Sequence, residues 1–273
     1  MNSTPTPANA TLNPRSIILT AQAIRLFWMA LYLYVPTLSV YAKTKTTDLA
    51  MVGVVIAQYG LWQAVIRLPL GIAADWLGRR KPFILAGCLL AIAGNWLMGA
   101  SGDIYSLVVG RAVTGLAAGA WVTMTVMFSG LFPAAEIVRA TAVITMVNSL
   151  SRMIATIVTG PLNDLGGYSL SFYLAAGLSG LALLVFLMVK EQHRTPLTPS
   201  PQSLAKLVMR RDVLLPSLLS AVGQYATYAA TYGFIPIMAQ QLGAGNLVQS
   251  VLTTLNLGVT MLGNLLASLV VKR

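Results

Sequence analysis

Acidic side chains are scarce in this chain of 273 residues, which contains 7 Asp and Glu against 18 Lys and Arg and a single His. No two carboxylates stand at a spacing that suits general acid–base catalysis. Cys88 has no second cysteine for a disulfide or thiolate metal site, and His193 is equally alone. The sequence therefore predicts no enzyme, no metal site and no cofactor.

Charge of either sign is also rare. Charged residues make up 9% of the chain and hydrophobic residues 56%, whereas soluble domains carry about 25% charged residues. The formal net charge of +11 could indicate nucleic-acid binding, but no basic stripe interleaved with exposed aromatics is present. The composition instead predicts an all-α integral membrane protein whose cations gather on one side of the bilayer.

Long apolar runs set the domain organisation. A bilayer span needs about 20 mainly apolar residues, and eight segments qualify, namely 16–42, 49–72, 82–100, 103–130, 139–162, 168–189, 213–240 and 247–271. Residues 1–15 form a polar tail, 16–189 a six-helix bundle, and 213–273 a partial second bundle. Residues 190–212 connect the two, either as a solvated linker or with a short interfacial helix whose apolar residues recur at helical spacing.

The basic residues fix the orientation. Alternate loops contain nearly all of them, namely Arg15, Arg79, Arg80, Lys81, Arg139, Lys190, Arg194, Lys206, Arg210, Arg211, Lys272 and Arg273. The opposite side has only Lys43 and Lys45. Because cytoplasmic loops are enriched in Lys and Arg, the N-terminus is predicted to be cytoplasmic, with the protein in a bacterial cytoplasmic (inner) membrane.

Residues 71–83, between the second and third spans, read Gly-Ile-Ala-Ala-Asp-Trp-Leu-Gly-Arg-Arg-Lys-Pro-Phe. This pattern resembles the signature loop of the major facilitator superfamily, and the matching residues are Gly71, Asp75, Gly78, Arg79, Arg80 and Lys81. The resemblance implies a bundle of two six-helix halves that transports solutes, with this loop as a conformational latch. Asp75 would cap a neighbouring helix N-terminus, and the glycines would let backbones approach closely. The alternative is a loop that only sets topology.

Two more motifs resemble the same family. Arg111 precedes Gly115 and Gly119 in the fourth span, as in the family's helix 4 motif, which implies a place at the central cavity and in proton transfer. The two glycines lie one turn apart and favour close helix packing. Gly160 and Pro161 partly match the helix 5 motif of antiporters, although four residues intervene before the next glycine pair. This partial match favours proton-coupled export over import.

Four arginines lie within spans: Arg25, Arg67, Arg111 and Arg152. Each should face the bundle interior or a water-filled path, unless its long side chain snorkels to an interface. For Arg67, a structural role beside the signature loop is an equal alternative. Asn148 shares a helix face with Arg152 and predicts either a binding site or a helix-packing network.

Tyrosines complete the predicted site. Trp28 and Tyr32 share a face of the first span, and Tyr225, Tyr228 and Tyr232 share a face of the seventh, so these rings are candidate solute contacts. For Tyr32 and Tyr232, near the outer face, an interfacial aromatic belt is the alternative, whereas Tyr225 and Tyr228 lie deeper. No Asp or Glu lies in the middle of a span. A cavity with positive charge and no acid predicts an anionic or zwitterionic small molecule.

These observations together predict a secondary active transporter of a small organic solute that works by alternating access. Residues 32–36 and 232–236 echo one another near the outer ends of the first and seventh spans, which supports two related halves. Because the second half holds two spans where the family generally has six, a truncated, inactive fragment or a membrane scaffold is the alternative.

Overall fold

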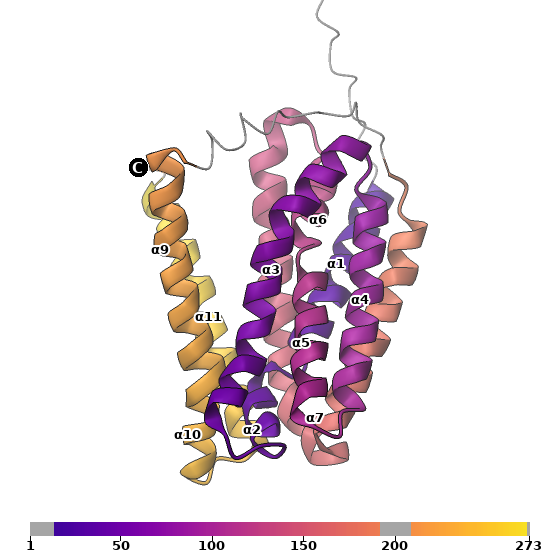
Figure 1. Cartoon of the computed structure of the whole chain (residues 1–273). Coiled ribbons are helices and arrows are strands. Elements are labelled where there is room, and N and C mark those ends of the chain that lie inside the picture. The colour runs from indigo at the N-terminus through magenta and orange to yellow at the C-terminus, as the bar shows by residue number, and fades with distance from the viewer. Residues whose placement is uncertain (1–13, 192–208, 272–273) are drawn as a thin grey trace, which may run out of the picture.

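The computed structural model describes residues 14–191 and 209–271, and the described residues form helices and no strand (Figure 1). The predicted tail up to residue 13, His193, the apolar residues of the proposed interfacial helix and the last two basic residues lie outside this part of the chain.

Helices of the first part of the chain coincide with the six predicted spans. In chain order they are α1 Pro14–Tyr32, η1 Val35–Thr37, α2 Leu38–Lys43, α3 Leu49–Leu77, α4 Lys81–Gly99, α5 Ile104–Ala118, α6 Trp121–Ser129, η2 Ala134–Glu136 and α7 Ile137–Met188. α7 is divided at Gly166 and Gly167, whose backbone leaves the helical region, with φ of 70° at Gly167. Glycine tolerates this left-handed conformation without a Cβ penalty, so the break separates the fifth and sixth predicted spans.

The second part contains α9 Arg211–Thr227, η3 Tyr228–Phe234, α10 Ile235–Gln241 and α11 Asn246–Val271. α9, η3 and α10 follow one another as the seventh predicted span, but η3 is a π-helix. A π-helix bonds residue i to i+5 and widens the turn, and such segments are frequent at functional sites. The sequence reasoning treated this span as a regular α-helix and missed the change.

Among the described residues, five helical segments are long and apolar enough to cross a membrane, namely Pro14–Lys43, Leu49–Leu77, Lys81–Gly99, Ile104–Ser129 and Ala134–Met188. The last has 55 residues, or about 80 Å of helix at 1.5 Å per residue, which is enough for two crossings of a core about 30 Å thick. Large apolar side chains on the outside, such as Leu61, Trp96 and Leu181, suit contact with lipid. The fold is therefore an all-α membrane bundle, as predicted.

Small residues permit a close helix contact between α5 and α3. A Cβ on Gly115 would lie 2.7 Å from the carbonyl oxygen of Tyr59, and one on Gly119 would overlap the side chain of Ile66. α5 therefore packs against α3 at backbone distance. This contact holds Tyr59 at a fixed depth on α3.

The two parts of the chain meet at one end of the bundle, which we call the outer end because it contains Lys43 and Gly102. There α2 contacts η3 and α10, and η1 contacts α11. Hydrogen bonds join α7 to α11, since Asn246 donates to Asp164 at 2.7 Å and the hydroxyls of Thr156 and Thr254 lie 2.9 Å apart.

Toward the opposite end, which contains the signature loop, the two parts diverge. α9 lies apart from α3 in Figure 1, although α10 reaches α2 at the outer end. None of the side chains of α9 is buried. The two parts are therefore in contact at the outer end and separated at the opposite end.

Two acids at the outer end cap helices. Asp48 accepts a hydrogen bond from the backbone N–H of Ala50 at 2.8 Å, and Asp103 accepts from the N–H of Ser106 at 2.9 Å and from its hydroxyl at 2.9 Å. The hydrogen bonds from Ser106 hold the pKa of Asp103 below its usual range. These acids serve helix N-termini and lie outside the membrane interior.

The predicted orientation can be tested by cysteine labelling. Gly102 is exposed and a Cβ there would meet nothing within 4 Å, and Met209 is 74% exposed near the opposite end. We expect a membrane-impermeant maleimide added to intact cells to label Gly102→Cys and not Met209→Cys. The unmodified protein is the control, because Cys88 is buried. Reversed labelling would contradict the orientation.

Candidate functional site

A cavity of about 340 Å³ lies between the two parts of the chain. Both parts contribute to its wall, which consists of Trp28, Tyr32, Tyr59, Gln63, Arg67, Trp121, Thr145, Asn148, Ser149, Arg152, Gln224, Thr227, Tyr228, Tyr232, Asn256, Leu257, Thr260 and Met261. The volume falls within the range of about 300–1,000 Å³ that is common for small-molecule sites. No carboxylate belongs to this wall, and the described residues contain no His, Cys, Asp and Glu cluster that could hold a metal.

Arg152 is the cation at the deep end of the cavity. It lies about 22 Å along α7 from Ile137, at 1.5 Å per residue. Its guanidinium carbon lies 4.1 Å from the centre of the Tyr32 ring, and its Nη2 donates to the Tyr232 hydroxyl at 3.3 Å. Its Nε is buried and has no partner among the described residues. Two tyrosines therefore hold the side chain in place, and the N–H of its buried Nε is left without an acceptor.

Aromatic rings form much of the surrounding wall. Tyr59 and Tyr228 stack with centroids 6.0 Å apart, and Tyr228 meets Tyr232 edge to face at 5.3 Å. On the other side, Trp28 and Trp121 meet edge to face at 5.4 Å. These contacts span α1, α3, α6 and η3, so the cavity is lined by rings that the tertiary structure brings together.

Three further polar atoms of the wall are buried without a partner among the described residues: Trp28 Nε1, Tyr59 Oη and Asn148 Oδ1. An unpaired buried polar group costs about 1–3 kcal/mol. Together with Arg152 Nε, the wall therefore offers two N–H donors, one hydroxyl and one acceptor that a bound solute or water would satisfy.

Sequence reasoning placed several of these residues at a site. The structure brings Asn148, Arg152 and Tyr228 together in the cavity wall, and Arg67 lies there too. Arg111 lies elsewhere, since it is 2% exposed and does not line the cavity.

The surroundings of Arg111 explain its burial. Its guanidinium carbon lies 4.2 Å from the centre of the Tyr59 ring, and its Nη1 donates to the Tyr34 hydroxyl at 3.3 Å. Because Tyr59 itself lines the cavity, Arg111 stands one side chain behind the wall.

The expected positions of two other residues were wrong. Arg25 is exposed beside Gln22 and does not line the cavity. Tyr225 is 76% exposed and borders an adjoining, mainly apolar groove. Tyr32 and Tyr232 are each 4% exposed and line the cavity, which favours a place at the site over an interfacial belt.

The π-helix accounts for the tyrosine error. At 3.6 residues per turn, positions 225, 228 and 232 share a face, but only the last two fall in η3. The wider turn aligns residues four to five apart, which turns Tyr228 and Tyr232 to the cavity together and leaves Tyr225 outside.

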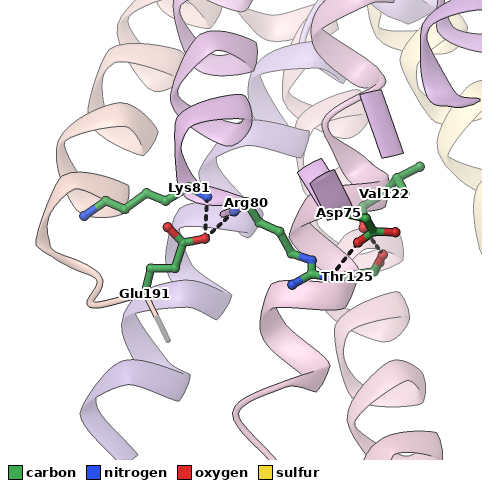
Figure 2. Close-up of polar contacts among 6 residues, drawn as sticks. All are labelled: Asp75, Arg80, Lys81, Val122, Thr125 and Glu191. Atoms are coloured by element: carbon green, nitrogen blue, oxygen red, sulfur yellow. Dashed lines mark hydrogen bonds and ion pairs between the residues drawn. The ribbon is translucent and has the colours of Figure 1, made fainter. Parts of the chain in front are cut away.

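The signature loop is ordered by local contacts (Figure 2). Gly78 ends α3 with φ of 63° and donates its N–H to the Asp75 carbonyl at 3.3 Å, as glycine does at helix C-termini. The Asp75 carboxylate pairs with Arg80 at 2.9 Å. Arg79 points to solvent. Gly71 is not needed for close approach, since a Cβ there would lie 3.7 Å from Val122, an ordinary contact.

A residue that the motif did not predict caps the next helix. The Glu191 carboxylate accepts hydrogen bonds from the backbone N–H groups of Arg80 and Lys81, at the N-terminus of α4 (Figure 2). Lys81 Nζ in turn donates to the carbonyls of Leu187 and Val189 at 2.8 and 2.7 Å. Among the described residues, the Asp75 carboxylate pairs with Arg80, and Glu191 caps the N-terminus of α4.

Gly160 marks the closest approach of the two parts at the outer end. A Cβ there would lie 2.7 Å from the carbonyl oxygen of Asn246 and 2.7 Å from the Cα of Leu247. Pro161 follows inside α7 and is exposed. The Gly-Pro pair thus packs α7 against the start of α11.

Similar solved structures share this fold. The transporter PepTSo of the POT family superposes with a TM-score of 0.64 over 90% of this chain and 52% of that chain, at 14% identity. A bacterial homologue of the human lysosomal transporter Spinster, in an inward-facing and unoccupied conformation, gives a TM-score of 0.59 over 74% of this chain and 47% of that chain, at 14% identity.

Sequence comparisons identify the family. The inner membrane transport protein YajR of Escherichia coli (strain K12) is 30% identical over 164 residues, which are 59% of this chain and 36% of that protein. This chain therefore spans about a third of that curated relative. The model of the Major Facilitator Superfamily matches residues 23–273. The chain belongs to the major facilitator superfamily.

Proposed function

We propose that this chain provides the solute-binding unit of a secondary active transporter, which moves a small organic anion or zwitterion across the membrane by alternating access. The observation that carries the proposal is the cavity between the two parts of the chain, with Arg152 at its deep end and no carboxylate in its wall. By analogy with the E. coli relative, we place the protein in a bacterial inner membrane.

The charge argument rests on the cost of an unpaired cation. In a low-dielectric interior the attraction between opposite charges is several times stronger than in water, and Arg152 meets tyrosines where an acid would neutralise it. An entering anion gains this attraction and supplies an acceptor for Nε. A cation would be repelled by the same residue.

Replacing Arg152 tests the site. We expect Arg152→Gln to weaken binding of an anionic solute at least about tenfold, the loss of roughly 1.4 kcal/mol, because glutamine keeps much of the bulk and removes the charge. Isothermal titration of the purified protein measures the affinity. Arg25→Gln is the matched control, since Arg25 lies in a helix but outside the cavity wall. Equal affinities in both variants would contradict the proposal.

Alternating access requires the outer contacts to separate. The hydrogen bonds between Asp164 and Asn246 and between Thr156 and Thr254 join the two parts, and neither lies within one packed half. Their polar character makes separation feasible, because water can replace each partner. We propose that these contacts close the outer end while the cytoplasmic end is open.

A larger side chain at residue 160 should open the outer end. In Gly160→Leu the added atoms have no room beside Asn246 and Leu247, and overpacking of this kind costs about 1–3 kcal/mol. We expect Ser149→Cys, in the cavity wall, to be labelled from outside several-fold faster when combined with Gly160→Leu. Gly177→Ala is the control, because that Cβ would meet nothing within 4 Å. An unchanged rate of labelling would contradict the proposed role of Gly160 in closing the outer end.

The signature loop is proposed as the cytoplasmic latch. Asp75 and Arg80 form a pair whose side chains are 41% and 12% exposed, and pairs this close to solvent contribute about 0–1 kcal/mol. Global stability therefore depends little on the pair, whereas the position of the α3–α4 turn depends on it directly.

Asp75→Asn separates these two effects. We expect the melting temperature to fall by less than about 4 °C, while the ratio of cytoplasmic to external labelling of Ser149→Cys changes at least threefold. Asp103→Asn, which removes the charge of an acid at the outer end, should leave the ratio unchanged. If Asp75→Asn also leaves it unchanged, the loop only sets topology.

Export by proton-coupled antiport is the proposed direction. Its support is the partial antiporter motif at Gly160 and Pro161 and the packing of that glycine on α11. The Arg111 side chain, enclosed by Tyr34 and Tyr59, is the proposed coupling group, because Tyr59 connects it to the cavity wall.

A further inference from the structure

We infer that the solute is a flat aromatic carboxylate. This inference rests on the proposed transport function and narrows it from organic anions in general to those with a delocalised ring. Two properties of the cavity wall carry it: the unpaired hydrogen-bonding atoms at one end and the ring surfaces that surround them.

The first property is the shortage of acceptors for buried donors. Arg152 Nε and Trp28 Nε1 each carry an N–H with no partner among the described residues, and both belong to the cavity wall. Tyr32 connects them, since its ring lies 6.0 Å from that of Trp28 and 4.1 Å from the Arg152 guanidinium carbon. A carboxylate accepts up to four hydrogen bonds and satisfies several donors with one planar group.

The second property is the aromatic character of the wall. Tyr59 and Tyr228 stack nearly parallel, with 29° between their planes, and both line the cavity. Trp28 and Trp121, which meet at 82° to each other, line it as well. Aromatic pairs prefer offset-stacked or edge-to-face contacts and add to the gain from area alone. A flat aromatic solute can form such stacked or edge-to-face contacts with these rings, whereas a puckered aliphatic ring has neither a π face nor an aromatic edge to offer them.

An aromatic wall can also bind cations, but here that capacity is already used. Arg152 lies over the Tyr32 ring and donates to Tyr232, and Arg111 lies over the Tyr59 ring, so the protein's own guanidinium groups occupy two of the electron-rich faces. A second cation in the same cavity would meet like charge with no carboxylate in the wall to offset it. The aromatic residues of the wall therefore contact the ring of the solute, and Arg152 binds its carboxylate.

Three matched compounds separate charge from ring chemistry. Naphthalene-2-carboxylate, its saturated analogue decahydronaphthalene-2-carboxylate and the neutral amide 2-naphthamide are titrated calorimetrically into the purified chain. We expect the aromatic carboxylate to bind about tenfold more tightly than either analogue, a difference of about 1.4 kcal/mol, because each analogue lacks one of the two contacts.

Variants assign the two contributions to residues. Arg152→Gln should abolish the preference for carboxylate over amide. Arg152→Lys keeps the positive charge and should retain the preference, which provides a second test if the glutamine variant folds poorly. Trp28→Leu should reduce the preference for the aromatic over the saturated carboxylate about tenfold. Trp96→Leu is its control, because Trp96 is 60% exposed and lies outside the cavity wall.

The outcomes distinguish this inference from the proposed function. Equal affinity for the aromatic and saturated carboxylates, with both lost in Arg152→Gln, would overturn the aromatic class and leave the anion site standing. Tighter binding of the amide than of either carboxylate would overturn both. A preference for the aromatic carboxylate that survives Trp28→Leu and Arg152→Gln unchanged would overturn the assignment to this cavity.

Discussion

The placement of one guanidinium in a low-dielectric interior without a carboxylate is the constraint on which the site depends. Arg152 is held by the face of Tyr32 and the hydroxyl of Tyr232, from opposite parts of the chain. Cation–π and neutral hydrogen bonds orient the group but leave its charge uncompensated. Burying an unpaired charge in that position raises the free energy of the empty protein. A bound solute anion lowers this free energy, so the same electrostatic interaction that makes the empty site unfavourable strengthens binding.

The same tyrosines also connect the two parts of the chain near the closed outer end. Polar contacts between α7 and α11, together with the absence of a side chain at Gly160, permit that closure at backbone distance. Hydrogen bonds of this kind contribute about 0.5–1.5 kcal/mol each, so a few of them hold an interface that a conformational change can open. At the other end, Glu191 and Lys81 tie the α4 N-terminus to the end of α7, which makes the signature loop part of a rigid unit.

Much of the architecture followed from sequence patterns. Apolar runs about 20 residues long and the signature loop indicated an all-α membrane bundle of this family, because a bilayer leaves the backbone few alternatives to a helix. The placement of Arg152, Asn148 and Tyr228 in one wall was also foreseeable, since a polar residue in a span tends to face the interior. The errors concern geometry between helices: Arg111 lies behind the wall, and Arg25 and Tyr225 lie outside it.

The sequence by itself determined the helices, their order and the shortage of acids, since these depend on composition and on contacts along one chain segment. Only the tertiary structure decided which side chains share the cavity. The π-helix at residues 228–234 resets the register of the seventh span, and helical periodicity at 3.6 residues per turn does not anticipate it. The capping of α4 by Glu191 depends on a contact between residues 110 positions apart, which no local pattern encodes. Contacts between side chains of different helices depend on how the helices pack, and that packing depends on all the helices of the bundle together.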